Sequence, residues 1–123
     1  MRKIKVLIVD DSPLVHKLIA KALPGDSFEV CGLAKNGREG LELYGDLHPD
    51  VVTMDITMPV MDGLTAAQEI LARDGRARII MLTSRGDKES VEKAKALGID
   101  AFIQKPFAPD QLLKTIQRLT LED

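Results

Sequence analysis

The chain has 123 residues, of which 45% are hydrophobic and 29% are charged, and its formal net charge at pH 7 is −2. This composition is typical of one globular domain with a core of ordinary size. Because the chain contains no block of Lys or Arg, it offers no electrostatic basis for binding nucleic acid. Aromatic residues make up only 3% of the chain and Trp is absent, which also argues against a surface that stacks on bases.

Cysteine usage and hydropathy indicate where the protein works. Cys31 is the single cysteine, so an internal disulfide is excluded, and this fits a reducing compartment. The apolar run near the N-terminus ends at two aspartates and is too short for the core of a signal peptide. No apolar stretch approaches the length of a membrane span. The sequence therefore predicts a cytoplasmic protein without membrane association.

Short apolar runs alternate with amphipathic stretches from the start of the chain. A strand is predicted over residues 5–9, followed by a helix over residues 13–23, because Ser12 suits the N-cap and Pro13 the first helical position. The apolar stripe predicted for this helix consists of Leu14, Leu18, Ile19 and Ala22.

The middle of the chain continues the alternation. A strand is predicted over residues 28–34, and a helix begins after Asn36, with Glu39 in the capping-box position. A third strand covers residues 51–54 and ends at Asp55. The stretch that follows is not helical throughout, since it contains Pro59 and Gly63.

The remaining elements complete an α/β pattern. They are a helix around residues 64–71, a strand over 79–82, a helix over about 88–97, a strand over 101–104 and a helix over 109–119. Five strands that alternate with five helices predict a parallel sheet covered by helices on both faces, within one domain over residues 1–123.

Polar residues follow four of the predicted strands. Asp10 and Asp11 come after the first strand, Asp55 after the third, Thr83 after the fourth and Lys105 after the fifth. In open parallel sheets, ligands bind outside the carboxyl ends of the strands, so these side chains are expected at one edge.

Three carboxylates in one pocket either keep a proton or recruit a cation. Two carboxylates about 4 Å apart repel each other by roughly 4 kcal/mol at an effective dielectric constant of about 20. An all-oxygen site with room for water suits Mg²⁺, which also assists phosphoryl transfer. The sequence therefore predicts metal-assisted phosphoryl transfer onto Asp55 as the nucleophile.

Each of these residues also has an ordinary explanation. Asp10 or Asp11 could cap the helix that follows, Thr83 is a common strand residue, and Lys105 alone is most often a solvated charge. Complementary groups at four strand ends together make these separate explanations much weaker.

Three motifs resemble those of receiver domains of two-component response regulators, and the match covers essentially the whole chain. They are the acidic motif at residues 6–12, the phosphoacceptor motif at residues 54–63 and the closing Lys105-Pro106-Phe107. The resemblance implies a flavodoxin-like (βα)5 fold with strand order 2-1-3-4-5.

The resemblance also implies a role for each site residue. Asp55 would accept a phosphoryl group from a histidine kinase, and Lys105 would contact that group. Asp11, Asp55 and the backbone carbonyl of Thr57 would bind Mg²⁺ directly, and Asp10 largely through water. The chain would not turn over external substrates, although it would phosphorylate itself from a donor and dephosphorylate itself.

A switch is implied as well. Thr83 would move toward the phosphoryl group and Phe102 would change its packing, which alters the surface of the fourth helix, fifth strand and fifth helix. That surface would control a protein target or an output domain, as a monomer or a phosphorylation-induced dimer. The bond between Lys105 and Pro106 is typically cis in this family.

Within the family, the chain is most similar to chemotaxis-type single-domain regulators or to the receiver of a chemotaxis methylesterase. Three rivals remain: a phosphohydrolase of the haloacid dehalogenase type, an interaction module that needs no phosphorylation, and a flavin carrier. The phosphohydrolase lacks its general acid, because Thr57 stands two residues after Asp55 where that class has Asp. The intact acid pair with Asp55, Thr83 and Lys105 disfavours the pure interaction module, and the chain has no Trp and one Tyr to stack a flavin.

Overall fold

The computed structural model describes residues 2–121 and contains one parallel sheet in the order β2-β1-β3-β4-β5. This confirms the predicted α/β class and strand order. The elements are β1 (Ile4–Val9), α1 (Pro13–Ala22), β2 (Phe28–Ala34), α2 (Gly37–Leu47), β3 (Val51–Asp55), α3 (Gly63–Arg73), β4 (Ile79–Thr83), α4 (Lys88–Ala96), β5 (Ala101–Gln104) and α5 (Pro109–Thr120). A short 3-10 turn, η1 (Arg85–Asp87), precedes α4 and was not predicted.

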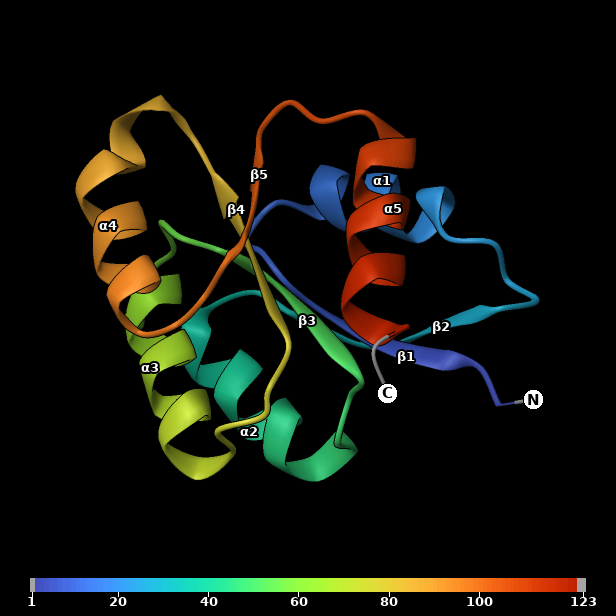
Figure 1. The fold of residues 1–123 in the computed structure, drawn as a ribbon, viewed down its shortest axis with the longest axis horizontal. Coiled ribbons are helices and arrows are strands. Elements are labelled where there is room, and N and C mark those ends of the chain that lie inside the picture. Colours follow the sequence, from blue (N-terminus) through green and yellow to red (C-terminus); the bar gives the residue numbers. More distant parts are fainter. Residues whose placement is uncertain (1, 122–123) are drawn as a thin grey trace.

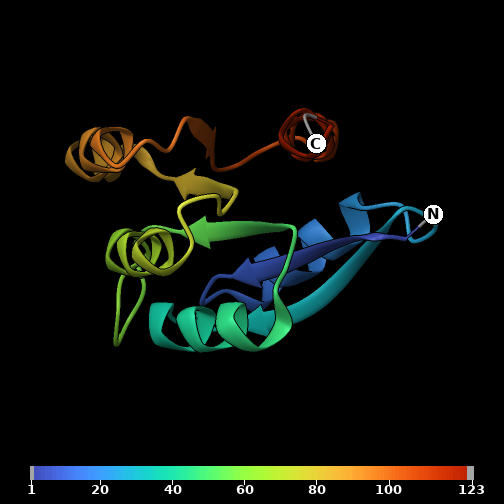
Figure 2. The same ribbon diagram turned by 60° about the horizontal axis from the view of Figure 1, so that its bottom comes forward.

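Helices cover the sheet from both sides, as Figures 1 and 2 show. Successive strand residues point to opposite faces, so each strand contributes side chains to two separate hydrophobic cores. On one face, Val6 and Ile8 pack with residues of α1 and α5; on the other, Leu7 and Val9 pack with residues of α2, α3 and α4. Apolar strands buried on both faces are typical of a parallel sheet with helical crossovers.

Strand register brings the polar strand ends to one edge. Val9 pairs with Met54, so Asp10 and Asp55 lie side by side at the ends of β1 and β3. Asp55 in turn pairs with Leu82, which puts Thr83 one position beyond it. Thr83 pairs with Gln104, and Lys105 follows directly. The prediction that these strand ends share one edge is therefore confirmed.

The predicted helix starts are confirmed, with one difference in detail. Ser12 caps α1 by accepting a hydrogen bond from the Val15 amide, and Asn36 caps α2 by accepting one from the Glu39 amide. The Glu39 carboxylate returns to the amide of Lys35, one residue earlier than a capping box requires.

The apolar stripe predicted for α1 is only partly correct. Ile19 is fully buried, whereas the side chains of Leu14 and Leu18 are 65% and 48% exposed. The inward face of this helix is instead formed by His16 and Ile19. Because Leu14 and Leu18 are four residues apart, they share a face of the helix, and this face is largely exposed. The helix has more apolar residues than its buried face can hold.

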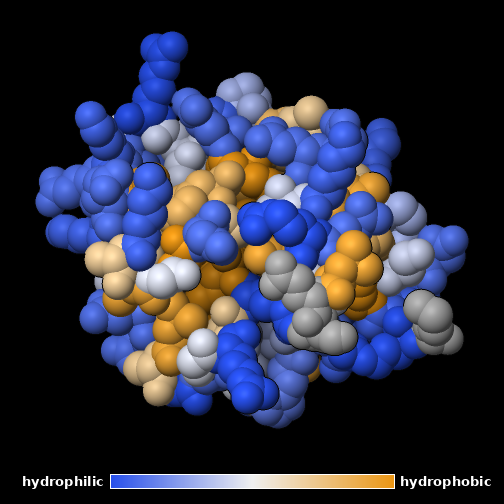
Figure 3. All heavy atoms as spheres, viewed as in Figure 1, coloured by the Kyte–Doolittle hydropathy of each residue, from blue (hydrophilic) through white to orange (hydrophobic). Residues whose placement is uncertain are grey.

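Apolar side chains also reach the surface elsewhere. In the view of Figure 3 they gather over β4 and β5, between the hydrophilic rims formed by the flanking helices. Leu97, at the end of α4, is among the exposed apolar residues. Within residues 2–121, no helix combines the length and the apolar character needed to cross a bilayer.

Candidate functional site

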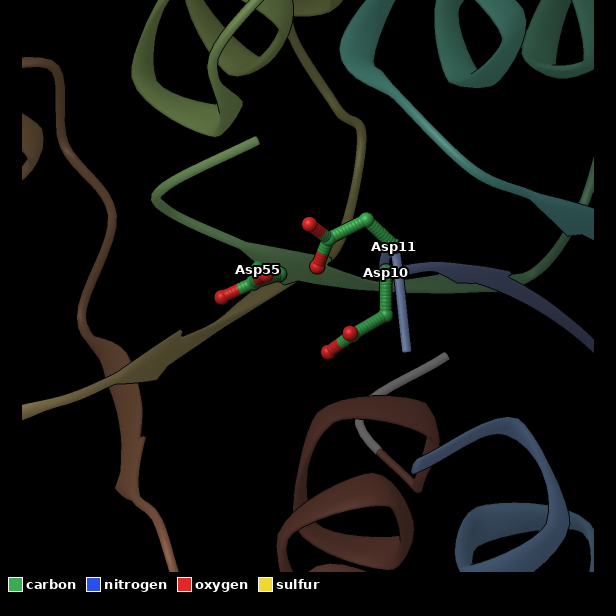
Figure 4. Close-up of side chains that lie close together, drawn as sticks. All are labelled: Asp10, Asp11 and Asp55. Atoms are coloured by element: carbon green, nitrogen blue, oxygen red, sulfur yellow. The ribbon is translucent and has the colours of Figure 1, made fainter. Parts of the chain in front are cut away.

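Three carboxylates meet at the carboxyl edge of the sheet. Asp10, Asp11 and Asp55 each offer an oxygen, and these oxygens all lie within 4.8 Å of one another. Figure 4 shows the three side chains leaving the ends of β1 and β3 and lying close together. Asp10 is fully buried and Asp55 is 6% exposed, while Asp11 reaches solvent. The cluster is thus buried at its base and open at its mouth.

Lys105 supplies the positive charge of this cluster. Its Nζ lies 2.8 Å from Asp10 Oδ2 and 3.2 Å from Asp55 Oδ1. Burial lowers the pKa of Lys105, but the Asp10 and Asp55 carboxylates outweigh burial, so the pKa is raised overall. The peptide bond from Lys105 to Pro106 is cis, as the resemblance implied. Lys105 therefore stays charged and holds the two carboxylates in place.

Asp10 is fixed by its own neighbours. Its Oδ1 accepts a hydrogen bond from the Ser12 amide at 2.9 Å. His16 Nε2 lies 2.6 Å from the Asp10 backbone oxygen, and because a carbonyl only accepts, the imidazole must carry its proton on Nε2. His16 is buried on α1. This histidine thus supports the backbone of the acid pair, a role that the sequence did not reveal.

The surroundings of Asp55 disfavour the negative charge on its carboxylate. Burial, followed by the nearby charge of Asp10, raises its pKa to about 6, although the Lys105 ammonium acts in the opposite direction. If all four groups are ionised, three carboxylates face one ammonium. The excess negative charge favours a bound cation, as the sequence predicted.

The loop after Asp55 is held close to the strand end. The Gly63 amide donates to the Ile56 carbonyl at 2.7 Å, and a Cβ at Gly63 would collide with the Asp55 carbonyl oxygen. Only glycine permits this approach. Val60, in the same loop, has φ of 68° and is 77% exposed, which is a strained conformation for a β-branched residue.

The remaining predicted residues lie on β4, on β5 and in the loop after β3. Thr83 is buried at the end of β4, and its carbonyl accepts the Lys105 amide at 2.8 Å. Thr57 is exposed, and its hydroxyl donates to Asp87 Oδ1 at 3.3 Å. Phe102 is half-buried on β5, with the Lys95 Nζ 5.9 Å from its ring centroid. Asp87 belongs to η1 and was not expected at the site.

An ion such as Mg²⁺ fits these residues. Hard carboxylate oxygens, one exposed ligand and an open mouth are what Mg²⁺ requires, because it keeps several waters and takes few carboxylates. Asp11 and Asp55 are best placed to ligate it, because both carboxylate oxygens of Asp10 are already engaged, one by the Ser12 amide and the other by Lys105.

Comparisons with known proteins agree with this geometry. Residues 6–117 match the family described as the response regulator receiver domain. The chemotaxis protein CheY of Bacillus subtilis (strain 168) is 44% identical over 114 residues, which cover 93% of this chain and 95% of that protein. The chain therefore belongs to the response regulator receiver family.

Solved structures of the family superpose closely on this one. The CheX-CheY-BeF3-Mg complex from Borrelia burgdorferi gives a TM-score of 0.86 at 33% identity, covering 94% of this chain and 87% of that one. The response regulator domain of Thermotoga maritima CheB gives 0.85 at 32% identity, covering 99% of both chains. The predicted likeness to chemotaxis receivers is confirmed. Members of this family are phosphoacceptors in two-component signalling rather than enzymes that turn over external substrates.

Proposed function

We propose that this protein is a phosphorylation-dependent switch, in which Asp55 accepts a phosphoryl group from a histidine kinase. The observation that carries the proposal is the cluster of Asp10, Asp11 and Asp55 within 4.8 Å, with Lys105 Nζ bridging Asp10 and Asp55. The site is open at Asp11, so a donor can reach Asp55 from solvent.

Mg²⁺ is the proposed cofactor. Asp11, Asp55 and the Thr57 carbonyl would hold it, and Asp10 would act largely through water. When bound, the ion would supply positive charge to the oxygens of the transferring phosphoryl group. The CheY complex from Borrelia burgdorferi contains Mg and BeF3, which supports this assignment.

The transfer itself needs little chemistry from the protein. An Asp55 carboxylate oxygen forms a bond to phosphorus, while the bond from phosphorus to the nitrogen of the donor's phosphohistidine breaks. The leaving imidazole nitrogen keeps the electron pair. Lys105 moves no proton in this step; its ammonium pairs with one of the phosphoryl oxygens. Hydrolysis of the acyl phosphate later returns Asp55 to its carboxylate.

Thr83 and Phe102 are the proposed switch residues. The Thr83 hydroxyl would turn toward the phosphoryl group, and Phe102 would repack beneath the surface formed by α4, β5 and α5. A downstream protein, or an output domain, would read that surface; phosphorylation could also produce a dimer. Relatives named chemotaxis protein CheY support a chemotaxis pathway. A single receiver domain over residues 1–123 remains our prediction.

Acyl-phosphate formation tests the proposal directly. The protein is incubated with acetyl phosphate, with and without Mg²⁺, and intact mass is followed with time. We expect one phosphoryl adduct that requires Mg²⁺, decays spontaneously and is absent from Asp55→Asn. Asp100→Asn, which changes an exposed acid on another loop, should label like the unsubstituted protein. No adduct despite Mg²⁺ binding would favour an interaction module, and steady phosphate release from unrelated monoesters would favour a phosphohydrolase.

A further inference from the structure

Asp87 connects the loop after β4, to which it belongs, with the loop after Asp55. Its Oδ2 accepts the Ser84 amide at 2.7 Å, and its Oδ1 accepts the Thr57 hydroxyl at 3.3 Å. Ser84 directly follows the proposed switch residue Thr83, and Thr57 stands two residues after Asp55. One carboxylate therefore ties the loop after β4 to the loop after β3.

Helix capping explains one of these two hydrogen bonds but not the other. With the Ser84 amide, Asp87 completes a capping box at the start of η1, whereas its bond to the Thr57 hydroxyl reaches the loop after β3. Asp87 immediately precedes α4, where an aspartate commonly accepts a hydrogen bond from the first amides of the helix. Here the Asp87 side chain makes no such bond to α4. It points back to the two loops instead, and the residue is half-buried.

We propose that Asp87 is a positioning residue that holds the loop after Thr83 in its unphosphorylated place. This inference depends on the proposed function of Asp55. The Ser84 amide fixes the Asp87 carboxylate within its own loop, and the Thr57 hydroxyl ties that carboxylate to the loop after β3. Asp87 therefore resists the movement of Thr83 that phosphorylation requires. It therefore sets how readily the receiver takes up a phosphoryl group.

Charge and hydrogen bonding decide the direction of the effect. A phosphoryl group on Asp55 brings about two negative charges and three acceptor oxygens to the same edge of the sheet. Those oxygens compete with Asp87 for the nearby donors, and the carboxylate repels them. In the unphosphorylated arrangement the Asp87 carboxylate keeps both of its hydrogen bonds, and in the phosphorylated arrangement it loses them. Asp87 therefore shifts the equilibrium toward the unphosphorylated arrangement.

Titration with beryllofluoride at saturating Mg²⁺ tests the inference, with binding followed by calorimetry. We expect Asp87→Ala to bind beryllofluoride about threefold to tenfold more tightly than the unsubstituted protein. Asp87→Asn, which keeps one oxygen acceptor and loses the charge, should give a smaller increase. Glu89→Gln removes the same charge two residues later, where the side chain pairs with Lys93 within α4, and should bind as the unsubstituted protein does.

A double variant separates positioning from a local effect on stability. Thr57→Val keeps the backbone carbonyl and removes only the hydroxyl, so adding it to Asp87→Ala should tighten binding no further. Equal or weaker beryllofluoride binding by both Asp87 variants, with their fold verified by thermal unfolding, would overturn the inference. If the unsubstituted protein itself binds no beryllofluoride with Mg²⁺, the proposed function fails, and the role of Asp87 fails with it.

Discussion

Two aspartates at opposite ends of β3 have pKa values that are shifted in opposite directions. Asp50, just before the strand, accepts two hydrogen bonds from the Arg2 guanidinium, at 2.8 and 2.6 Å, and one from the Lys5 amide at 2.7 Å. The Arg2 hydrogen bond leads the interactions that lower the pKa of Asp50. Asp55, at the other end, shares Lys105 with Asp10, and burial leads the effects that raise its pKa to about 6.

This difference separates a structural charge from a functional one. Asp50 is satisfied within the chain and also donates its own amide to the Lys5 carbonyl, so it clamps β1 to the start of β3. Asp55 is buried with too little positive charge around it, which is costly unless a ligand arrives. One end of β3 is therefore held to β1 by Asp50, and the other end favours the binding of a cation or a phosphoryl group at Asp55.

Removing Asp50 should cause the largest loss of stability. Asp50→Ala leaves the half-buried Lys5 amide without its acceptor, so we expect the free energy of unfolding to fall by about 2–3 kcal/mol. The partly exposed Arg2 pair adds little to this because solvent screens it. Chemical denaturation measures the change, and Asp46→Ala, at an exposed acid on α2, is the matched control.

A loss no greater than that of Asp46→Ala would contradict the clamp. Labelling by acetyl phosphate should be unaffected in Asp50→Ala, because Asp50 lies at the far end of β3 from the acidic cluster.

The pH dependence of stability should show the opposite behaviour at Asp55. Its folded pKa of about 6 lies above the ordinary value of 3.8, so the folded state binds this proton more tightly than the unfolded state. The resulting stabilisation is present at low pH and is lost as pH rises from about 4 to about 6. Relative to Asp55→Asn, the cation-free protein should lose about 1–3 kcal/mol of unfolding free energy across that interval.

Denaturation of both proteins at several pH values measures this difference, and Mg²⁺ should reduce it because the ion stabilises the charged carboxylate. Asp50 acts in the other direction: its lowered pKa stabilises the fold at neutral pH, and the contribution is lost as pH falls through that pKa. If the difference in unfolding free energy between the unsubstituted protein and Asp55→Asn did not change with pH, the pKa of Asp55 would not be raised in the folded state.

The sequence predicted this contrast only in part. Parallel strands end at a common edge, so the meeting of Asp10 and Lys105, 95 residues apart, follows from the order of the elements. Burial of the α1 leucines was predicted wrongly, because spacing shows that Leu14 and Leu18 share a face but not whether anything covers it. The contact between Thr57 and Asp87 depends on the path of two irregular loops, which no residue pattern describes.

Loss of Asp11 should weaken Mg²⁺ binding without a comparable effect on folding. Asp11 is the exposed member of the acidic cluster, so its carboxylate is already hydrated in the folded state. Removing it should therefore change the free energy of unfolding little. We expect Asp11→Ala to lower Mg²⁺ affinity about tenfold, which corresponds to about 1.4 kcal/mol. Calorimetric titration measures it, with Asp100→Ala as the control at an exposed acid outside the cluster. Unchanged affinity would rule out Asp11 as a direct ligand.

Thr53 gives the smallest effect and the most informative one, because it lies between the two aspartates on the same strand. It is fully buried, and its hydroxyl has no hydrogen-bond partner among residues 2–121. Its register partners are Ile8 and Ile80, which belong to the apolar core beneath α1 and α5. Unlike Asp55, this unsatisfied group carries no charge that could help recruit a cation.

The unpaired Thr53 hydroxyl should therefore lower the free energy of unfolding without serving the site. Thr53→Val keeps the β-branched shape, removes the unpaired hydroxyl and should raise the free energy of unfolding by up to about 1 kcal/mol. Thr115→Val is the matched control, since the Thr115 hydroxyl donates to the Gln111 carbonyl at 2.8 Å, and it should not stabilise the protein. Acetyl phosphate labelling should be unchanged in both variants. A loss of stability in Thr53→Val would mean that the hydroxyl is satisfied after all, and Asp55 would then be the one poorly compensated group on β3.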